Sequence, residues 1–227
     1  SVDRQTDCGV HTRCGHEIGV ASTKSFTAQI VVLYLLALKF AESKKTMSKI
    51  SLKRHLDYHD SVKKIQSLFN KENYIKKIAM KYKNANDFLY LGRGYQFPVA
   101  LEGALKLKEI SYIHAAGYPA GEMKHGPIAL LEKKVPVISI ATPGNVFEKV
   151  ISNAQEAKAR DSYLVGISPE CEGTEIFDYL IPLPLIDEWI SPLLTVVPMQ
   201  LLSYHIAAHR GLDVDQPRNL AKSVTVE

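Results

Sequence analysis

Short apolar segments alternate with amphipathic helical segments through the second half of the chain. Segments 87–92, 135–142, 162–168 and 179–184 are bounded by Gly, Pro or Asp and are rich in β-branched or aromatic residues, which predicts strands. Helices are predicted over 98–111, 146–160 and 191–209. Because strands that alternate with helices pair in parallel through crossovers, we expect an α/β domain over 79–218, with a mainly parallel sheet between helices.

The N-terminal segment, 1–44, predicts only a strand, a loop and one helix that starts near Ser22, which is too little for a sheet. A weak internal repeat accompanies it, aligning Glu17 with Glu188, Gln29 with Gln200 and Ala37 with Ala208. We therefore expect residues 1–44 to be the terminal strand and helix of a truncated, earlier copy of the same kind of domain. Residues 45–78 are predicted to be a helical linker, and 26–40 to carry an exposed apolar face.

Composition limits the functional classes. The chain of 227 residues is 46% hydrophobic and 23% charged with a net charge of +4, which is typical of a soluble globular protein and gives little support to nucleic-acid binding. The apolar run 30–38 is about half the length that spans a bilayer, so we expect no membrane span. Three cysteines indicate a reducing, cytoplasmic location. The cluster of Cys8, His11, Cys14 and His16 has no distant second ligand pair, so no metal is expected.

Three charged residues of the 98–111 helix share one face. Glu102, Lys106 and Glu109 stand at i, i+4 and i+7. They fit a surface ladder of ion pairs, or a carboxylate proton shuttle tuned by a neighbouring ammonium. Helical spacing does not separate the two interpretations.

Other segments also allow both a structural and a functional interpretation. Gly92, Arg93 and Gly94 follow a predicted parallel strand, where anions often bind, but no complete nucleotide-binding motif is present. Ser22 fits a helix N-cap. His125 lies in a turn and is either exposed or used for proton transfer near neutral pH. Lys222, in the tail 219–227, is either solvated or an amine for Schiff-base chemistry.

Three long motifs carry a resemblance to a known family. They are "EIGVASTKSFTAQ" at 17–29, "LGRGYQFPVALEGALKLKEISYIHAAGYPAGEMKHGP" at 91–127 and "DVDQPRNLAKSVTVE" at 213–227. In these, the chain resembles the isomerase part of the glutamine:fructose-6-phosphate amidotransferases. The resemblance implies flavodoxin-like sugar-isomerase (SIS) domains and a homodimer or higher oligomer. It also implies a reaction without a cofactor, in which fructose 6-phosphate and glutamine-derived ammonia give glucosamine 6-phosphate.

The same resemblance implies roles for individual residues. Lys222 is similar to the lysine that forms a Schiff base with the open-chain ketose, and Glu109 to the base that moves a proton between the first two carbons. Lys106 corresponds to its charged neighbour, and His125 to the ring-opening group, which this family supplies across the dimer. Residues implied to line the sugar site are Val20, Ser22 and Ala221. Residues 219–227 would form a catalytic tail.

Two departures from the family lead to a further expectation. The chain has no Ser-rich loop of the type S-x-S-G-E-T and no glutaminase segment with its cysteine nucleophile. We expect the fragment by itself to be inactive and the longer parent to be the competent enzyme. The alternatives are a non-catalytic SIS module that binds a sugar phosphate and regulates a partner, and an SIS deglycase, against which the tail "PRNLAKSVTVE" argues.

Overall fold

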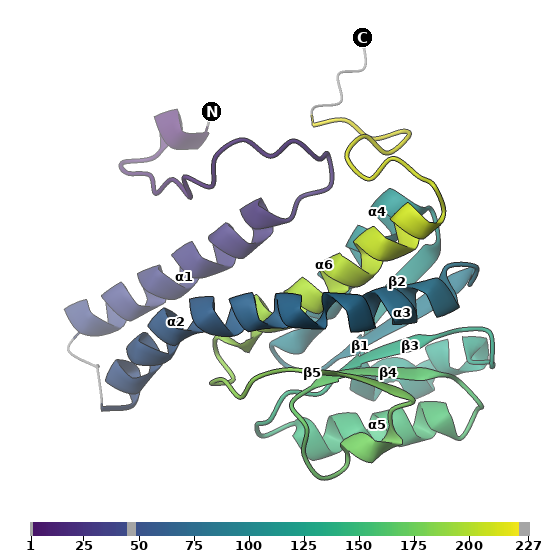
Figure 1. Ribbon diagram of the computed structural model, residues 1–227. Helices are drawn as coiled ribbons and strands as arrows, with labels where there is room; N and C mark the ends of the chain where they lie inside the picture. The colour runs from purple at the N-terminus through teal and green to yellow at the C-terminus, as the bar shows by residue number, and fades with distance from the viewer. Residues whose placement is uncertain (1, 45–48, 223–227) are drawn as a thin grey trace.

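Five parallel strands form the centre of the molecule. The computed structural model describes residues 2–44 and 49–222 (Figure 1). The strands are β1 (Asp87–Gly92), β2 (His114–Pro119), β3 (Val137–Ile140), β4 (Leu164–Ser168) and β5 (Tyr179–Pro182), in the order β2-β1-β3-β4-β5. All neighbours pair in parallel. This is the flavodoxin-like order of a doubly wound sheet, so the predicted α/β fold is confirmed.

Helices cover both faces of the sheet. Helices α3 (Glu72–Tyr82), α4 (Gln96–Ser111) and α6 (Ser191–His209) lie on one face, and α5 (Phe147–Lys158) lies on the other (Figure 1). The predicted helices 98–111, 146–160 and 191–209 are all present. Short 3₁₀ turns are η1 (Val2–Gln5), η2 (Phe69–Lys71), η3 (Ala120–His125), η4 (Pro127–Leu130) and η5 (Thr174–Ile176).

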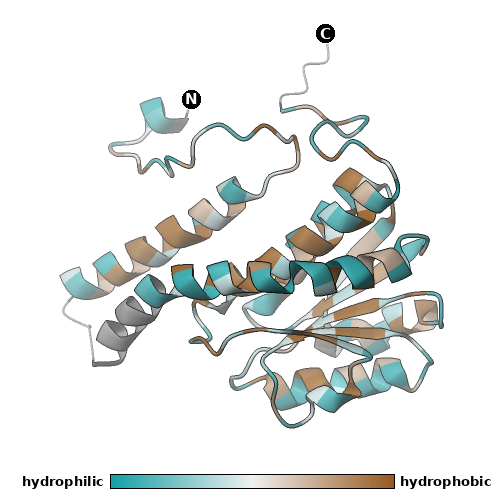
Figure 2. Cartoon of the chain, viewed as in Figure 1, coloured by the Kyte–Doolittle hydropathy of each residue, from teal (hydrophilic) through white to brown (hydrophobic). Residues whose placement is uncertain are grey.

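The sheet separates two apolar cores. Phe88 and Tyr90 of β1 face the core shared with α3, α4 and α6, whereas Leu89 and Leu91 face the core shared with α5. All four side chains are 3% exposed or less. A strand that is buried on both faces has to be apolar along its whole length, because successive side chains point to opposite sides. Figure 2 shows apolar residues along the central strands, as this burial requires.

Strand β2 is absent from the sequence prediction. Its sequence, HAAGYP, has no apolar alternation and only one strong β-former, Tyr118, and it contains Gly and Pro. It forms a strand because it lies at the sheet edge and pairs with β1 from Asp87↔His114 to Gly92↔Pro119. Gly117 is needed there because a Cβ would stand 2.9 Å from the backbone of Leu101, on α4.

The strand predicted within 1–44 is wrong for the residues that the structure describes there. Val2–Gln5 forms η1, and from Thr6 to Thr23 the chain has no strand or helix. A strand requires neighbouring backbone to satisfy its hydrogen bonds, and this segment pairs with none of the five strands. The predicted helix is present as α1 (Lys24–Ser43).

Helix α1 is apolar beyond what its contacts bury. Phe26, Ile30 and Val31 pack against the core, but Leu33 and Phe40 are 66% and 64% exposed, so the predicted exposed apolar face is present. With 20 residues, α1 is the one described helix whose length and composition would suffice to cross a membrane, a test that apolar helices of other kinds also pass. The helix is longer than the run 30–38 on which the sequence prediction rested.

The segment predicted to be a linker contributes to the core. It contains all of α2 (Lys49–Leu68) and the first turns of α3. Ile75 and Ile78 of α3 are fully buried, and Leu68 at the end of α2 is 1% exposed. The last part of the segment therefore packs as an integral helix on the sheet.

We expect Gly92→Ala to destabilise the protein strongly. A Cβ at this position would stand 2.1 Å from the carbonyl oxygen of Gln96 in the first turn of α4, where only backbone could yield. The free energy of unfolding, measured by urea denaturation, should fall by about 3 kcal/mol. The control is Gly94→Ala, which meets no atom within 4 Å and suffers only from its φ of +57°, at about 1 kcal/mol. Equal losses in the two variants would contradict this assignment.

Candidate functional site

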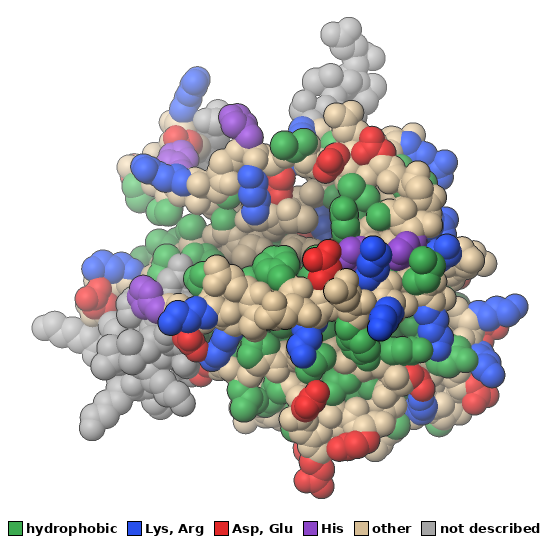
Figure 3. All heavy atoms as spheres, in the orientation of Figure 1, with side chains coloured by type: hydrophobic (Ala, Val, Ile, Leu, Met, Phe, Trp, Pro, Cys, Tyr) green, Lys and Arg blue, Asp and Glu red, His purple; other side chains and the backbone are tan. Residues whose placement is uncertain are grey.

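A cavity of about 300 Å³ lies between the segment that precedes α1, the helices α4 and α6, and the loop after α6. It is lined by His16, Glu17, Ile18, Gly19, Ala21, Thr23, Lys24, Lys106, Ile110, Gln200, Tyr204, Val214 and Asp215. Figure 3 shows the surface hollowed between the N-terminal segment and the helices below it. Four parts of the chain thus enclose one site.

The cavity lies at an unexpected end of the α/β domain. Lys106 and Ile110 belong to the last turns of α4, which runs from the carboxyl end of β1 back toward the start of β2. The usual ligand crevice of such a sheet lies at the carboxyl ends of β1 and β3. Arg93 lies there, but its guanidinium donates to Asn153 Oδ1 at 3.4 Å and packs over Gly121.

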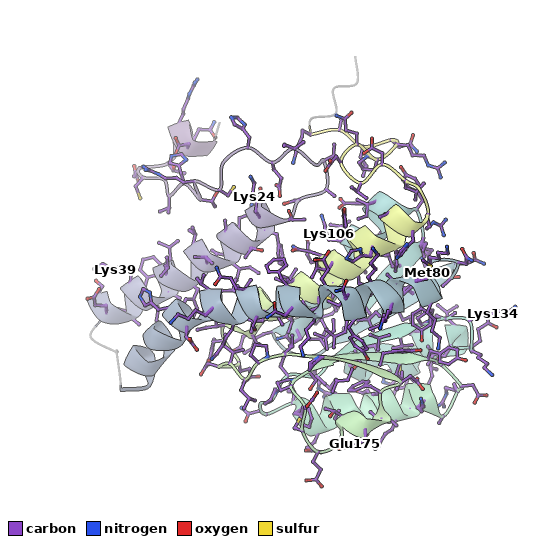
Figure 4. All side chains as sticks on the ribbon, viewed as in Figure 1. Lys24, Lys39, Met80, Lys106, Lys134 and Glu175 are labelled. Carbon is purple, nitrogen blue, oxygen red and sulfur yellow. The ribbon has the colours of Figure 1, made fainter. Side chains whose placement is uncertain are left out.

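On α4, a buried lysine joins two carboxylates. Lys106 is 3% exposed, and its Nζ lies 2.6 Å from Glu109 Oε2 and 3.5 Å from Glu102 Oε1. Figure 4 shows Lys106 and Lys24 on opposite sides of the gap between α1 and the body. Burial raises the pKa of Glu102, while the Lys106 ammonium opposes that change by favouring the carboxylate. This cluster is more buried than a surface ladder, because its central ammonium is shielded from water.

On the other side of the cavity, Glu17 caps the N-terminus of α1. Its Oε1 accepts hydrogen bonds from the backbone N–H groups of Thr23 at 2.6 Å and Lys24 at 2.9 Å, and its Oε2 accepts one from the Ser25 hydroxyl. Burial alone would raise the pKa of Glu17, but these hydrogen bonds, with Lys222, outweigh it and lower the pKa to about 2. Glu17 is therefore ionised at neutral pH and complements the helix N-terminus.

The loop after α6 brings the C-terminal segment to this carboxylate. Val20 N donates to the carbonyl of Asp215 at 2.8 Å, and Arg218 stacks over the Tyr112 ring, 4.2 Å from its centroid. Lys222 Nζ then lies 3.7 Å from Glu17 Oε2. Glu17 and Lys106 line the same cavity, so the two ion-paired clusters face one site.

Comparison with known proteins decides the family. Residues 81–210 match the SIS domain, which is more than half of the chain. The chain belongs to the SIS-domain family. The matched residues run from the end of α3 to the end of α6, and so include all five strands.

Relatives of this SIS chain share one description. A glutamine–fructose-6-phosphate aminotransferase [isomerizing] from Gloeobacter violaceus is 59% identical over 222 residues, which is 96% of this chain and 36% of the relative. One from Nostoc is 60% identical and is likewise covered over 35% of its length. The chain thus spans little more than a third of the curated relatives that it matches.

Solved structures agree with the fold. The C-terminal domain of glucosamine-fructose-6-phosphate aminotransferase from Francisella tularensis superposes with a TM-score of 0.90 at 37% identity, covering 94% of this chain and 61% of that one. A glucosamine-6-phosphate deaminase from Thermotoga maritima gives a TM-score of 0.65 at 26% identity, covering 93% of this chain and 60% of that one.

The SIS chain brings together some of the residues singled out in the sequence. Lys106 lines the cavity, and Glu109 and Lys222 are ion-paired to residues that line it. Val20 and Ser22 are partly buried in the wall segment without lining the cavity, and Ala221 is exposed next to Lys222. His125 is exposed at the end of η3 and does not line this cavity.

Sequence reasoning missed several residues of the cavity wall. Lys24, Gln200, Tyr204 and Asp215 were not singled out as site residues, and Glu17 served only as a repeat marker. A carboxylate shortly before a Ser/Thr-rich helix start is a capping signal that could have identified Glu17. Gln200 and Tyr204 stand one helical turn apart in an apolar helix and carry no local signal.

The cysteine and histidine cluster near the N-terminus does not assemble a metal site in the structure. Cys14 contacts the hydroxyls of Thr12 and Ser25 instead. Across residues 2–44 and 49–222, no group of three or more His, Cys, Asp or Glu side chains is placed to hold a metal ion.

We expect Lys106→Met to raise the pKa of Glu102 further. The ammonium is the group that favours the ionised form of this carboxyl, and its removal leaves the effect of burial unopposed. A ¹³C titration of the Glu102 carboxyl by NMR measures the change. Lys108→Met, at an exposed position of the same helix, is the control and should leave the titration unchanged. An unaltered Glu102 titration in Lys106→Met would show that the Lys106 ammonium, 3.5 Å away, does not affect the ionisation of Glu102.

Proposed function

We propose that this chain is the isomerase part of a glutamine–fructose-6-phosphate aminotransferase and makes glucosamine 6-phosphate in the complete protein. The observation that carries the proposal is that two ion pairs face one cavity. One is formed by the accessible amine of Lys222 with Glu17, and the other by the buried Lys106 with Glu109. The names of the relatives at 59% and 60% identity support the same assignment.

The amine supplies the covalent step. Lys222, as a free base, attacks C2 of the open-chain ketose, and water leaves as the imine forms. Ammonia then displaces the lysine, so that nitrogen from glutamine becomes bonded to C2 and the Lys222 amine is regenerated. Exposure of about half of its side chain allows Lys222 to reach a substrate in the cavity.

The carboxylate supplies the proton transfer. An imine at C2 makes the protons on C1 acidic, and Glu109 removes one of them and returns a proton to C2, which yields a 2-amino aldose. The Lys106 ammonium, 2.6 Å from Glu109, holds this carboxylate in place and keeps a positive charge beside it. Glu102 shares the same ammonium, and burial raises the pKa of its carboxyl.

Ring opening is assigned to His125 of a second copy. Within one chain His125 is exposed on η3 and away from the cavity wall, so it would act only where another subunit brings it to a site. A homodimer or larger assembly is therefore part of the proposal. No cofactor is required, since every step uses an amine, a carboxylate or an imidazole.

The remaining functions are assigned to residues outside this chain. The sequence holds no S-x-S-G-E-T loop to bind the sugar phosphate, and it covers 36% of the Gloeobacter relative. We infer that the complete protein adds the phosphate site and a glutaminase that supplies ammonia. The chain alone is expected to be inactive, and the complete enzyme to be cytoplasmic.

In the full-length protein, Lys222→Ala should abolish glucosamine 6-phosphate formation and borohydride trapping of fructose 6-phosphate, while glutamine hydrolysis continues. Glu109→Gln should still be trapped by borohydride but turn over about 10²- to 10⁴-fold more slowly, because it has lost only the proton-transfer group. Lys108→Ala, an exposed change on α4, is the control and should have wild-type kinetics. Undiminished synthesis in Glu109→Gln would contradict the proton-transfer role of Glu109.

Intersubunit complementation tests the place of His125. Full-length His125→Asn and Glu109→Gln homodimers should each be nearly inactive. After subunit exchange in a 1:1 mixture, half of the dimers are hybrids with one intact site each, so activity should recover to about a quarter of wild type. Recovery fails if His125 and Glu109 act within one subunit, because every site would then keep one defect.

A further inference from the structure

The Glu17 carboxylate has an environment that the proposed reaction does not explain. Its side chain is 10% exposed, and each of its oxygens is engaged. Oε1 accepts three hydrogen bonds, from Thr23 N, Lys24 N and, at 3.1 Å, Thr23 Oγ1. Oε2 accepts the Ser25 hydroxyl and lies 3.7 Å from the Lys222 ammonium. One side chain thus connects the start of α1 to the end of the described chain.

Glu17 has a fixed negative charge that it does not exchange. Hydrogen bonds from Ser25 and Thr23 outweigh the effect of burial and hold its pKa at about 2. It is therefore a poor proton acceptor at neutral pH, which excludes it as a general base. The other titratable groups that line the cavity are His16, Lys24, Lys106, Tyr204 and Asp215.

Lys222 depends on Glu17 for its place. The preceding anchor of the tail is Arg218, which stacks on Tyr112 and donates its backbone N–H to the Tyr112 hydroxyl at 2.7 Å. Lys222 follows four residues later, and four extended residues reach at most about 14 Å. Residues 219–222 belong to no helix or strand, and the Lys222 side chain is 48% exposed. Without the ion pair, the amine would sample a wide volume around the cavity mouth.

We propose that Glu17 is a positioning residue, which docks Lys222 at the cavity as an ammonium and releases it as the amine reacts. The inference rests on the proposed function, because it gives Lys222 the covalent step. An ion pair at 3.7 Å whose lysine is half exposed is weak, which suits a contact that has to break whenever the lysine attacks a carbonyl. The proton leaves to solvent, since Glu17 stays ionised, and the neutral amine then condenses with the ketose.

The test is Glu17→Gln in the full-length protein, which keeps the shape and a carbonyl acceptor for the α1 backbone but removes the charge. Turnover should fall about tenfold to a hundredfold, with a change of less than about twofold in the KM for fructose 6-phosphate, because the reacting amine is misplaced. The pH profile of borohydride trapping at Lys222 should shift to lower pH, because the lost anion no longer favours the ammonium. Glu17→Asp, which keeps the charge, should restore the wild-type pH profile.

Two variants serve as controls. Ser25→Ala removes one hydrogen bond to Glu17 without removing its charge, so the trapping profile should stay near that of wild type. Glu42→Gln, at the other end of α1, breaks the exposed pair with Lys39 and should leave turnover and profile unchanged. Thermal unfolding of every variant shows whether folding is intact.

The outcomes separate this inference from the function on which it rests. Wild-type turnover in Glu17→Gln, or a loss of turnover without a shift of the trapping profile, overturns the positioning role and leaves Glu17 as a helix cap alone. If Lys222→Ala still forms product, the proposed covalent step itself fails. Loss of activity in Lys222→Ala together with a shifted profile in Glu17→Gln supports both.

Discussion

The packing of α4 against α6 on one face of the parallel sheet is the constraint on which the site depends. Both helices bury apolar side chains against β1 and its neighbours, and this leaves Lys106 enclosed at 3% exposure. An ammonium in such a place is stable only with close anions, which Glu102 and Glu109 provide from the same helix. The ion triad and its place beside Gln200 and Tyr204 are thus a direct result of how the sheet is covered.

Two kinds of ion pair meet at the cavity, and their difference in solvent exposure matches the chemistry proposed for each. Lys106 and Glu109 are held by one helix and are largely shielded from water. This arrangement suits a carboxylate that has to stay aligned with its substrate. Lys222 and Glu17 join two irregular segments, and the lysine is half exposed. A proton shuttle benefits from the first arrangement, and an amine that forms and breaks a covalent bond benefits from the second.

The sequence predicts those elements whose local pattern and tertiary environment agree. Strand β1 and helix α6 occupy the predicted residues, since both are apolar on every side that the fold buries. Strand β2 could not be predicted, because its pairing with β1 overrides a sequence containing Gly117 and Pro119. In the site, helical spacing placed Glu109 beside Lys106, but nothing local predicts that the segment at Glu17 and the tail at Lys222 meet, because that contact depends on how α6 directs the chain.

The route of the chain after α6 sets an order of assembly. Residues 213–222 follow the end of α6 and reach the cavity by two contacts. Asp215 accepts a hydrogen bond from Val20 N, and Arg218 stacks on the Tyr112 ring. Both of these contacts join residues 213–222 to parts of the chain that are synthesised long before them. During translation, the sheet and helices can therefore become compact while the cavity still lacks the segment that carries Lys222. A chain that stopped shortly after α6 would therefore contain all five strands and the helices that cover them but lack the cavity wall formed by Val214 and Asp215.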